Sequence, residues 1–298
     1  MPLLLITIPW DPIVATLGGL VLAWHGVFTA VGILAGVQIS LYVGKKIRYS
    51  EDDAYSIALV GVPSGVLGAR LLYVAEHWSF FSAAPLEIFA INEGGISVWG
   101  AVIGGVLGGL LFAAWRRYDI RGGLDIAAFG LVLGLSLGRI GDLINGEHLA
   151  KATGLPWGVV YTDPDSPAFA HSIAVGPHHP ATTYEMLASF VLLALMFPIL
   201  RRFRDRPGLT FVVFLDIYSA IRFAVSFLRV DSTHAAFGLD MPQFISVVVI
   251  LGSLPFAWWF WAHPRPFEEA APPSMPGAAR VRVAAPPRNP RGRRGGDL

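Results

Sequence analysis

Seven charged side chains lie within or beside stretches that are apolar enough to sit in a lipid bilayer. They are Arg70, Arg139, Asp142, Glu147, Asp216, Arg222 and Arg229. His25 is an additional titratable residue in such a stretch. A charge at membrane depth costs about 2.5–3.5 kcal/mol on insertion scales, so such residues usually face a partner or a wet cavity. Arginine presents a planar fork of donors that matches phosphate oxygens, so four arginines in this setting favour a site for an anionic headgroup. The alternative is that each arginine pairs with a carboxylate and only holds helices together.

The segment 138–158 concentrates candidate groups at the end of an apolar stretch. Gly141 and Gly146 permit tight turns or close approach of the backbone. Asn145 can donate and accept hydrogen bonds, and Glu147 is either a base or a partner for an arginine. We therefore expect this segment to form part of a lipid headgroup site, where a helix end meets water.

The composition is that of a membrane protein, because 54% of the 298 residues are hydrophobic and only 14% are charged. The absence of cysteine excludes disulfides, thiolate metal sites and a cysteine nucleophile. A thiol that takes part in the chemistry must therefore come with a substrate. The first ten residues hold no basic region, and the apolar stretch that follows is long enough to span a membrane, so no cleavable signal is expected.

Hydropathy predicts an all-α integral membrane protein with seven transmembrane helices, because a span needs roughly 20 mostly apolar residues. The predicted spans are, approximately, 13–43, 54–74, 96–115, 124–143, 183–200, 209–228 and 244–262. They form one membrane domain, residues 1–263. Residues 264–298 are rich in Pro, Ala, Arg and Gly, which predicts a disordered basic tail.

Basic residues predict the orientation of the helices. Three follow the first predicted helix, three the third, four the fifth and seven the last, so seventeen of the 22 basic residues lie on one side. Because loops with excess lysine and arginine stay in the cytoplasm, the N-terminus should lie outside and the C-terminus in the cytoplasm.

This topology predicts the depth of the site residues. Arg70, Arg139 and Arg222 should lie in the outer half of the membrane, Arg229 at its outer surface and His25 near the middle of the first helix. Arg222 and Arg229 are seven residues apart, two helical turns, so they should share one face. Four arginines from three helices are therefore expected to gather at the depth of the outer headgroups.

Two further patterns predict structure rather than chemistry. Glycines recur at every fourth position in 100–108 and in 130–138, a spacing that lets helices pack closely in lipid. His171, His178 and His179 lack a helical spacing or an accompanying carboxylate, so we interpret them as surface histidines and expect no metal.

One motif runs Gly138-Arg139-Ile140-Gly141-Asp142-Leu143-Ile144-Asn145-Gly146-Glu147 and is followed by Pro156-Trp157-Gly158. Shorter motifs occur in order: Trp24-His25-Gly26, Gly68-Ala69-Arg70, Gly94-Gly95-Ile96-Ser97, His179-Pro180 with Tyr184-Glu185, Tyr218 with Arg222, Arg229 and Asp231, and Gln243. Together they resemble the bacterial prolipoprotein diacylglyceryl transferases, over nearly the whole chain except the tail.

The resemblance implies an enzyme that transfers a diacylglyceryl group from phosphatidylglycerol to the lipobox cysteine of preprolipoproteins and releases glycerol phosphate. This is the first step of bacterial lipoprotein maturation. It implies a multi-pass protein of the bacterial cytoplasmic (inner) membrane, with phosphatidylglycerol and preprolipoprotein signal peptides as partners. No cofactor, metal or nucleic acid is expected. The residues expected to bind the headgroup are Arg70, Arg139, Asp142, Asn145, Arg222 and Arg229.

The chain departs from the family pattern where chemistry is concerned. His25 stands in place of a tyrosine, Asp142 in place of an asparagine and Ser226 in place of a glutamate. Trp99 replaces the family's histidine, a leading candidate for the catalytic base, and tryptophan accepts no proton at neutral pH. His25 could supply the base from another helix, because imidazole titrates in the right range. Glu147 is the alternative base.

Arg139 and Arg222 complete the expected catalytic set with His25 and Glu147. A second hypothesis is a family paralogue with lost or altered transfer activity, which binds phospholipid or lipoprotein signal segments. A third, a small transporter, is disfavoured because the sequence has no paired broken helices and no inverted repeat.

Overall fold

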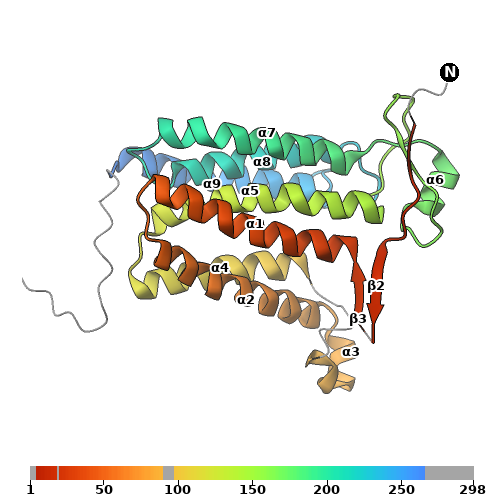
Figure 1. Cartoon of the computed structure of the whole chain (residues 1–298), viewed down its shortest axis with the longest axis horizontal. Coiled ribbons are helices and arrows are strands. Elements are labelled where there is room, and N and C mark those ends of the chain that lie inside the picture. Colours follow the sequence, from red (N-terminus) through yellow and green to blue (C-terminus); the bar gives the residue numbers. More distant parts are fainter. Residues whose placement is uncertain (1–4, 19, 90–96, 266–298) are drawn as a thin grey trace, which may run out of the picture.

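The computed structural model is a bundle of long helices that run side by side, and it describes residues 5–18, 20–89 and 97–265 (Figure 1). The helices are α1 Trp24–Lys46, α2 Glu51–Glu76, α3 Trp78–Ala83, α4 Val98–Arg116, α5 Ile120–Asn145, α6 Phe169–Val175, α7 Ala181–Arg202, α8 Leu209–Ser226 and α9 Met241–Ala262. A short 3-10 helix, η1, covers Pro85–Phe89. The strands are β1 Ile6–Ile8, β2 Ile13–Leu17, β3 Leu20–Ala23 and β4 Val159–Tyr161.

Six of these helices, α1, α2, α5, α7, α8 and α9, are long and apolar enough to cross a membrane. Within α4, the stretch Gly100–Arg116 is a shorter apolar helix. The structure therefore agrees with the helical integral membrane protein expected from hydropathy. Of the predicted tail, only residues 264–265 lie within the described part of the chain.

Glycines decide how closely two pairs of helices approach. A Cβ atom on Gly36 of α1 would lie 2.7 Å from the carbonyl oxygen of Gly130 of α5. A Cβ atom on Gly68 of α2 would lie 2.8 Å from the Cα atom of Gly104 of α4. Alanine at either position would push the helices apart, so the predicted role in close packing is confirmed for Gly104 and Gly130, whereas a Cβ atom on Gly138 would meet no atom within 4 Å.

The largest hydrophobic core joins α5 to α7 and α8. Phe129 and Val132 of α5 are buried with Leu192 and Met196 of α7 and Phe214 of α8. In Figure 1, α7, α8 and α9 lie on one side of α5, whereas α1 and then α2 and α4 lie on the other. The core therefore fixes the ends of α5, α7 and α8 relative to one another.

The first predicted helix is wrong over residues 13–17 and 20–23, which form the antiparallel strands β2 and β3. Leu17 pairs with Leu20, and Gly18 turns the chain with a φ of +61°, a conformation that glycine adopts without strain. β2 is rich in β-branched residues, which favour strands over helices. Because α1 begins only at Trp24, His25 lies in its first turn and not near its middle.

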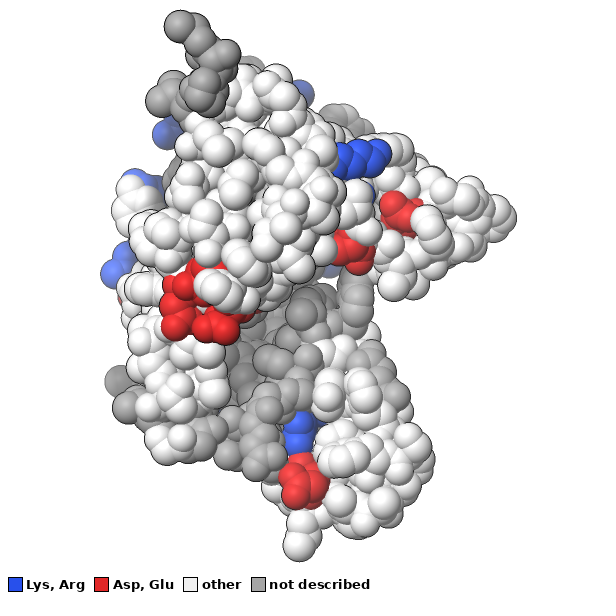
Figure 2. Space-filling model, turned by 90° about the vertical axis from the view of Figure 1, so that its right-hand side faces the viewer, with Lys and Arg blue, Asp and Glu red and all other residues white. Residues whose placement is uncertain are grey.

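The two ends of the bundle carry different polar groups. One end, where α8 begins and α9 ends, is called the far end below. There the buried Asp125 carboxylate accepts hydrogen bonds from the backbone N–H groups of Gly208 at 2.8 Å and Phe211 at 3.0 Å. There the Arg206 guanidinium lies 3.7 Å from the ring centroid of Trp261. At the opposite end, α5 and α8 end and α1 and α7 begin, and this end is called the site end because it carries the candidate site described below. Figure 2 views the site end, where charged side chains occupy a few separate places on a mostly uncharged surface.

Candidate functional site

The last two turns of α5 carry Arg139 and Asp142, which are three residues apart and share a face. The guanidinium of Arg139 donates a hydrogen bond to the Asp142 carboxylate. Gly146 ends the helix with a φ of +77°, and a Cβ atom there would collide with Ser166 and Tyr161. This glycine is therefore required both for its backbone conformation and for its lack of a side chain.

Side chains of the following loop satisfy backbone carbonyls at the end of α5. The Tyr161 hydroxyl donates to the carbonyl oxygen of Leu143 at 2.7 Å, and the Ser166 hydroxyl donates to that of Asn145 at 3.0 Å. The last carbonyls of a helix have no partner within it, so these bonds fix the helix end. Arg139 and Asp142 are thus held on a rigid support.

Glu185 of α7 is the centre of the polar network, although its residue is only 1% exposed. Its carboxylate accepts hydrogen bonds from Arg139 Nη2 at 2.9 Å, from the Tyr218 hydroxyl at 2.8 Å and from Arg222 Nη1 at 2.6 Å. Tyr218 and Arg222 lie one turn apart on α8. A buried charge is tolerated only with such partners, so the network holds α5, α7 and α8 together.

A short backbone pairing brings His148 against Arg229. The N–H of Lys151 donates to the carbonyl of Leu228 at 2.8 Å, and that of Val230 donates to Leu149 at 3.0 Å. As a result, His148 Nδ1 lies 2.9 Å from Arg229 Nη2 and its Nε2 lies 3.0 Å from Arg139 Nη1. The network thereby extends to the turn after α8.

The reason given for grouping Arg222 with Arg229 is wrong. α8 ends at Ser226, so Arg229 lies in the following turn and does not share a helical face with Arg222. Arg229 donates to both carboxylate oxygens of Asp231 at 2.9 Å. Burial alone would raise the pKa of Asp231, but hydrogen bonds from His148 and Arg229 outweigh it and hold the pKa below its usual value.

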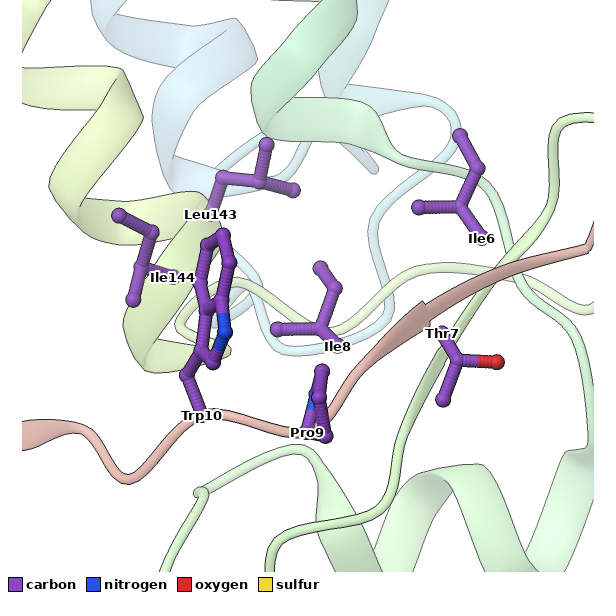
Figure 3. A pocket seen from close by; sticks show the side chains of 7 residues that line it. All are labelled: Ile6, Thr7, Ile8, Pro9, Trp10, Leu143 and Ile144. Carbon is purple, nitrogen blue, oxygen red and sulfur yellow. The ribbon is translucent and has the colours of Figure 1, made fainter.

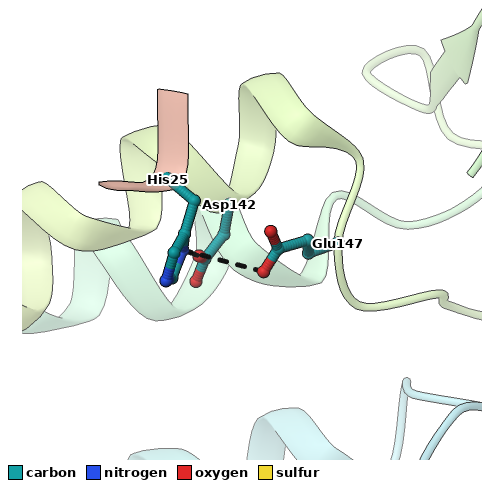
Figure 4. Close-up of side chains that lie close together, drawn as sticks. All are labelled: His25, Asp142 and Glu147. Carbon is teal, nitrogen blue, oxygen red and sulfur yellow. Dashed lines mark hydrogen bonds and ion pairs between the residues drawn. The ribbon is translucent and has the colours of Figure 1, made fainter. Parts of the chain in front are cut away.

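His25 faces two carboxylates at the edge of this network (Figure 4). Its Nδ1 atom lies 2.5 Å from Asp142 Oδ1 and 3.7 Å from Glu147 Oε2. Asn145 donates to the other oxygen of Glu147 at 3.1 Å, and its own Oδ1 is buried without a hydrogen-bond partner among the described residues. The His25 side chain is 45% exposed, which leaves it accessible to a substrate.

The same three groups offer one candidate ligand atom each, all within 4.8 Å of one another. Two ligands on a tetrahedral zinc ion are about 3.3 Å apart, given bonds of about 2.0–2.1 Å. The Nδ1–Oδ1 distance of 2.5 Å is instead that of a direct hydrogen bond between the two side chains. The three groups as they stand are therefore a hydrogen-bonded His25–Asp142 pair with Glu147 beside it.

One predicted site residue, Arg70, has other contacts, and two positions where the chain departs from the family pattern add nothing to this network. Arg70 donates from Nε to the carbonyl of Ile88 at 2.8 Å and also to that of Glu87, so these contacts join α2 to η1. The Ser226 hydroxyl is buried and donates to the Phe223 carbonyl of its own helix at 2.6 Å. The side chain of Trp99 lies outside the described residues.

A small apolar pocket adjoins the end of α5 (Figure 3). It encloses about 190 Å³ and is lined by the segment Ile6–Trp10 with Leu143 and Ile144. Its lining carries no charged group, so it suits an apolar group of a ligand and supplies no chemistry itself.

Four network residues, Glu185, Tyr218, Asp231 and His148, were not among the predicted site residues. Glu185, Tyr218 and Asp231 occur in the short motifs of the sequence, but nothing local shows that Glu185 is the residue that Arg139 and Arg222 share. His148 directly follows the motif residue Glu147, but its contact with Arg229 depends on a backbone pairing between residues about 80 positions apart in the chain.

Comparison with known proteins gives a consistent result. Residues 12–259 match the family model for prolipoprotein diacylglyceryl transferase. The chain is 30% identical over 244 residues to a phosphatidylglycerol–prolipoprotein diacylglyceryl transferase of Clostridioides difficile, covering 82% of this chain and 93% of the relative. Enzymes of the same name are 32% identical in Gloeobacter violaceus, covering 83% and 92%, and 30% identical in Nostoc sp., covering 91% and 97%.

Proposed function

Because this chain belongs to the prolipoprotein diacylglyceryl transferase family, we propose that it moves a diacylglyceryl group from phosphatidylglycerol to the lipobox cysteine of preprolipoproteins. It is a diacylglyceryl transferase and a multi-pass membrane protein. The observation that carries the proposed reaction is the convergence of Arg139, Arg222 and Arg229 with the His25–Asp142 pair at one end of the bundle.

The nucleophile is the thiolate of the substrate cysteine, since this chain holds no cysteine. His25 accepts the thiol proton, and Asp142 at 2.5 Å holds the ring in the required tautomer and stabilises the imidazolium that forms. Glu147, at 3.7 Å from the same ring nitrogen, adds negative charge beside that imidazolium. The thiolate then attacks the glycerol carbon that carries the phosphate.

The arginines stabilise the phosphate that departs. As the carbon–oxygen bond breaks, the phosphate gains negative charge, and guanidinium donors placed in a partly dry site stabilise that change. Arg222 uses one nitrogen for Glu185, and its side chain is 20% exposed, so its other donors can reach a ligand. We assign headgroup binding to Arg139, Arg222 and Arg229 with Asp142 and Asn145, and to Arg70 from the α2 side.

The proposed setting is the inner membrane of a bacterium, with seven spans, the N-terminus outside and the C-terminal basic tail in the cytoplasm. Seventeen basic residues on one side of the predicted spans support this orientation. The site then opens toward the outer leaflet, where a signal peptide and a phospholipid can both approach.

A transfer assay tests the proposal. The protein in phosphatidylglycerol vesicles is mixed with a lipobox peptide, and the peptide mass is then measured. We expect a gain equal to one diacylglyceryl group, reduced about 10²–10³-fold in Arg139→Ala because one transition-state donor is lost. Arg202→Ala, at the opposite end of α7, is the matched control and should retain the wild-type rate.

A well-folded wild-type protein that gives no mass gain would overturn the transfer reaction. Binding of phosphatidylglycerol or of the signal peptide, measured on the same preparation, would then support a family member with lost or altered activity. A gain that Arg139→Ala does not reduce would overturn the assignment of the site and leave the reaction intact.

A further inference from the structure

The ring of His148 has an unusual environment, because each of its nitrogens faces an arginine. Nε2 lies 3.0 Å from Arg139 Nη1, and Nδ1 lies 2.9 Å from Arg229 Nη2. Guanidinium groups only donate hydrogen bonds, and a neutral imidazole has one donor and one acceptor. At least one of these two contacts therefore sets a donor against a donor.

Arg229 has further unused donor capacity. Its side chain is only 7% exposed, and its Nη1 atom is buried with no partner among the described residues. Buried donors normally have partners, and an anion between the two arginines would accept from both of them. His148 thus lies between the guanidinium groups of Arg139 and Arg229.

Asp142 connects this histidine to the proposed base. Its Oδ1 atom lies 2.5 Å from His25 Nδ1, and its Oδ2 atom lies 3.5 Å from His148 Nε2. Two histidines from different segments therefore face the two oxygens of one carboxylate. One of them lies on the side of Glu147 and the other on the side of the arginines.

We propose that His148 is a second catalytic histidine, which protonates the departing phosphate while His25 accepts the thiol proton. This inference rests on the proposed transfer reaction. His148 donates through Nε2 to the phosphate oxygen held by Arg139 and Arg229, and Asp142 links the two histidines.

The proton and electron balance is closed. The sulfur–carbon bond forms, the carbon–oxygen bond breaks, and its electron pair goes to the phosphate oxygen. The thiol proton goes to His25, and the phosphate oxygen takes a proton from protonated His148. Afterwards the proton on His25 returns to His148 through Asp142 or water, so each turnover restores both groups.

A protonated imidazole donates through its ring N–H groups, and a departing phosphate oxygen accepts, so His148 has the donor that this leaving group needs. The groups that face His148 are Arg139 and Asp142 of α5 and Arg229 and Asp231 after α8. Two cations and two carboxylates thus surround the ring, and a phosphate held by the two arginines would face it as well.

The test compares two lipids in the full-length protein. One is phosphatidylglycerol, and the other has sulfur in place of the oxygen between the diacylglycerol carbon and phosphorus, a leaving group that needs no proton. His148→Gln should slow transfer from phosphatidylglycerol about 10²-fold and abolish the loss of kcat at alkaline pH. With the sulfur lipid, the variant should stay within about threefold of wild type, because the acid is no longer needed.

His234→Gln is the matched control, because that side chain is 91% exposed, and it should leave both rates unchanged. Equal losses with both lipids, or an unchanged alkaline side of the pH profile in a His148→Gln protein of wild-type thermal stability, would overturn the assignment of His148. Wild-type protein that transfers from neither lipid would instead overturn the proposed function, and this inference with it.

Discussion

Asp125 and Glu185 are the two most deeply buried carboxylates among the described residues, they lie at opposite ends of this bundle, and their partners differ in kind. Asp125, at the far end, accepts backbone N–H groups of Gly208 and Phe211. Glu185, at the site end, accepts only side-chain donors, from Arg139, Tyr218 and Arg222. The backbone N–H groups cannot release Asp125 without unfolding the start of α8. The side-chain donors of Glu185 can instead rotate to form a hydrogen bond with a ligand.

If the proposed site is correct, this difference separates a structural carboxylate from a functional one of similar burial. Asp125 satisfies the first N–H groups of α8, which no other part of that helix can satisfy. Glu185 orients the guanidinium groups of Arg139 and Arg222, which in the proposed reaction would receive the phosphate. Burial and charge alone do not distinguish the two residues, but the identity of the donors does.

Among the changes that test this comparison, removing the charge of Glu185 should have the largest effect. In Glu185→Gln, the amide nitrogen faces an arginine donor, and the guanidinium groups of Arg139 and Arg222 lose their shared anchor. We expect kcat/KM for transfer to fall about 10²-fold, the size of a lost preorganised donor. Transfer is measured by peptide mass in vesicles, with thermal unfolding in detergent as the control for folding. A variant that transfers at the wild-type rate would remove Glu185 from the site and make the two carboxylates alike.

The same chemical change at the far end should act on stability instead. Asp125→Asn keeps one acceptor and sets an amide N–H₂ group against a backbone N–H of α8. Hydrogen bonds to charged groups contribute about 1.5–3 kcal/mol, so we expect the free energy of unfolding to fall by about 2 kcal/mol. Transfer per folded molecule should stay within about twofold of wild type. A loss of transfer as large as that of Glu185→Gln, without a loss of stability, would contradict the comparison.

Hydropathy and periodicity predicted most of the helices, because a spanning helix needs only a long apolar run. They failed over residues 13–17 and 20–23, where a glycine turn and β-branched residues form a hairpin within an equally apolar stretch. Hydropathy does not distinguish an apolar strand from an apolar helix, so the position of His25 in the first turn of α1 was not predicted.

The sequence named several residues of the candidate site but not the contacts that connect them. Arg139, Asp142 and Arg222 were identified because charges at membrane depth need a reason. That Glu185 is the shared partner follows from the core of α5, α7 and α8, which no local pattern encodes. The place of His148 between two arginines depends on the pairing of Ala150 with Arg229, a contact between distant parts of the chain.

The smallest expected effect concerns arginines at the far end. Arg206 stacks on Trp261 at 3.7 Å and donates to its backbone carbonyl, so its partners are an aromatic ring and a peptide group. Arg206→Ala should lower the free energy of unfolding by about 0.5–1 kcal/mol, the size of an exposed cation–π contact, and leave transfer unchanged. Arg222→Ala changes an arginine near the C-terminal end of α8, at the opposite end of the bundle from Arg206. It should lower transfer with a similarly small loss of stability, since Glu185 keeps two of its three donors.

If Arg206→Ala and Arg222→Ala lowered transfer equally, the far end would take part in function, and the type of partner would not distinguish the two ends. Unequal effects of this kind would extend the rule from carboxylates to arginines: side-chain ion pairs mark the end that reacts, and backbone or aromatic partners mark the end that holds the bundle together.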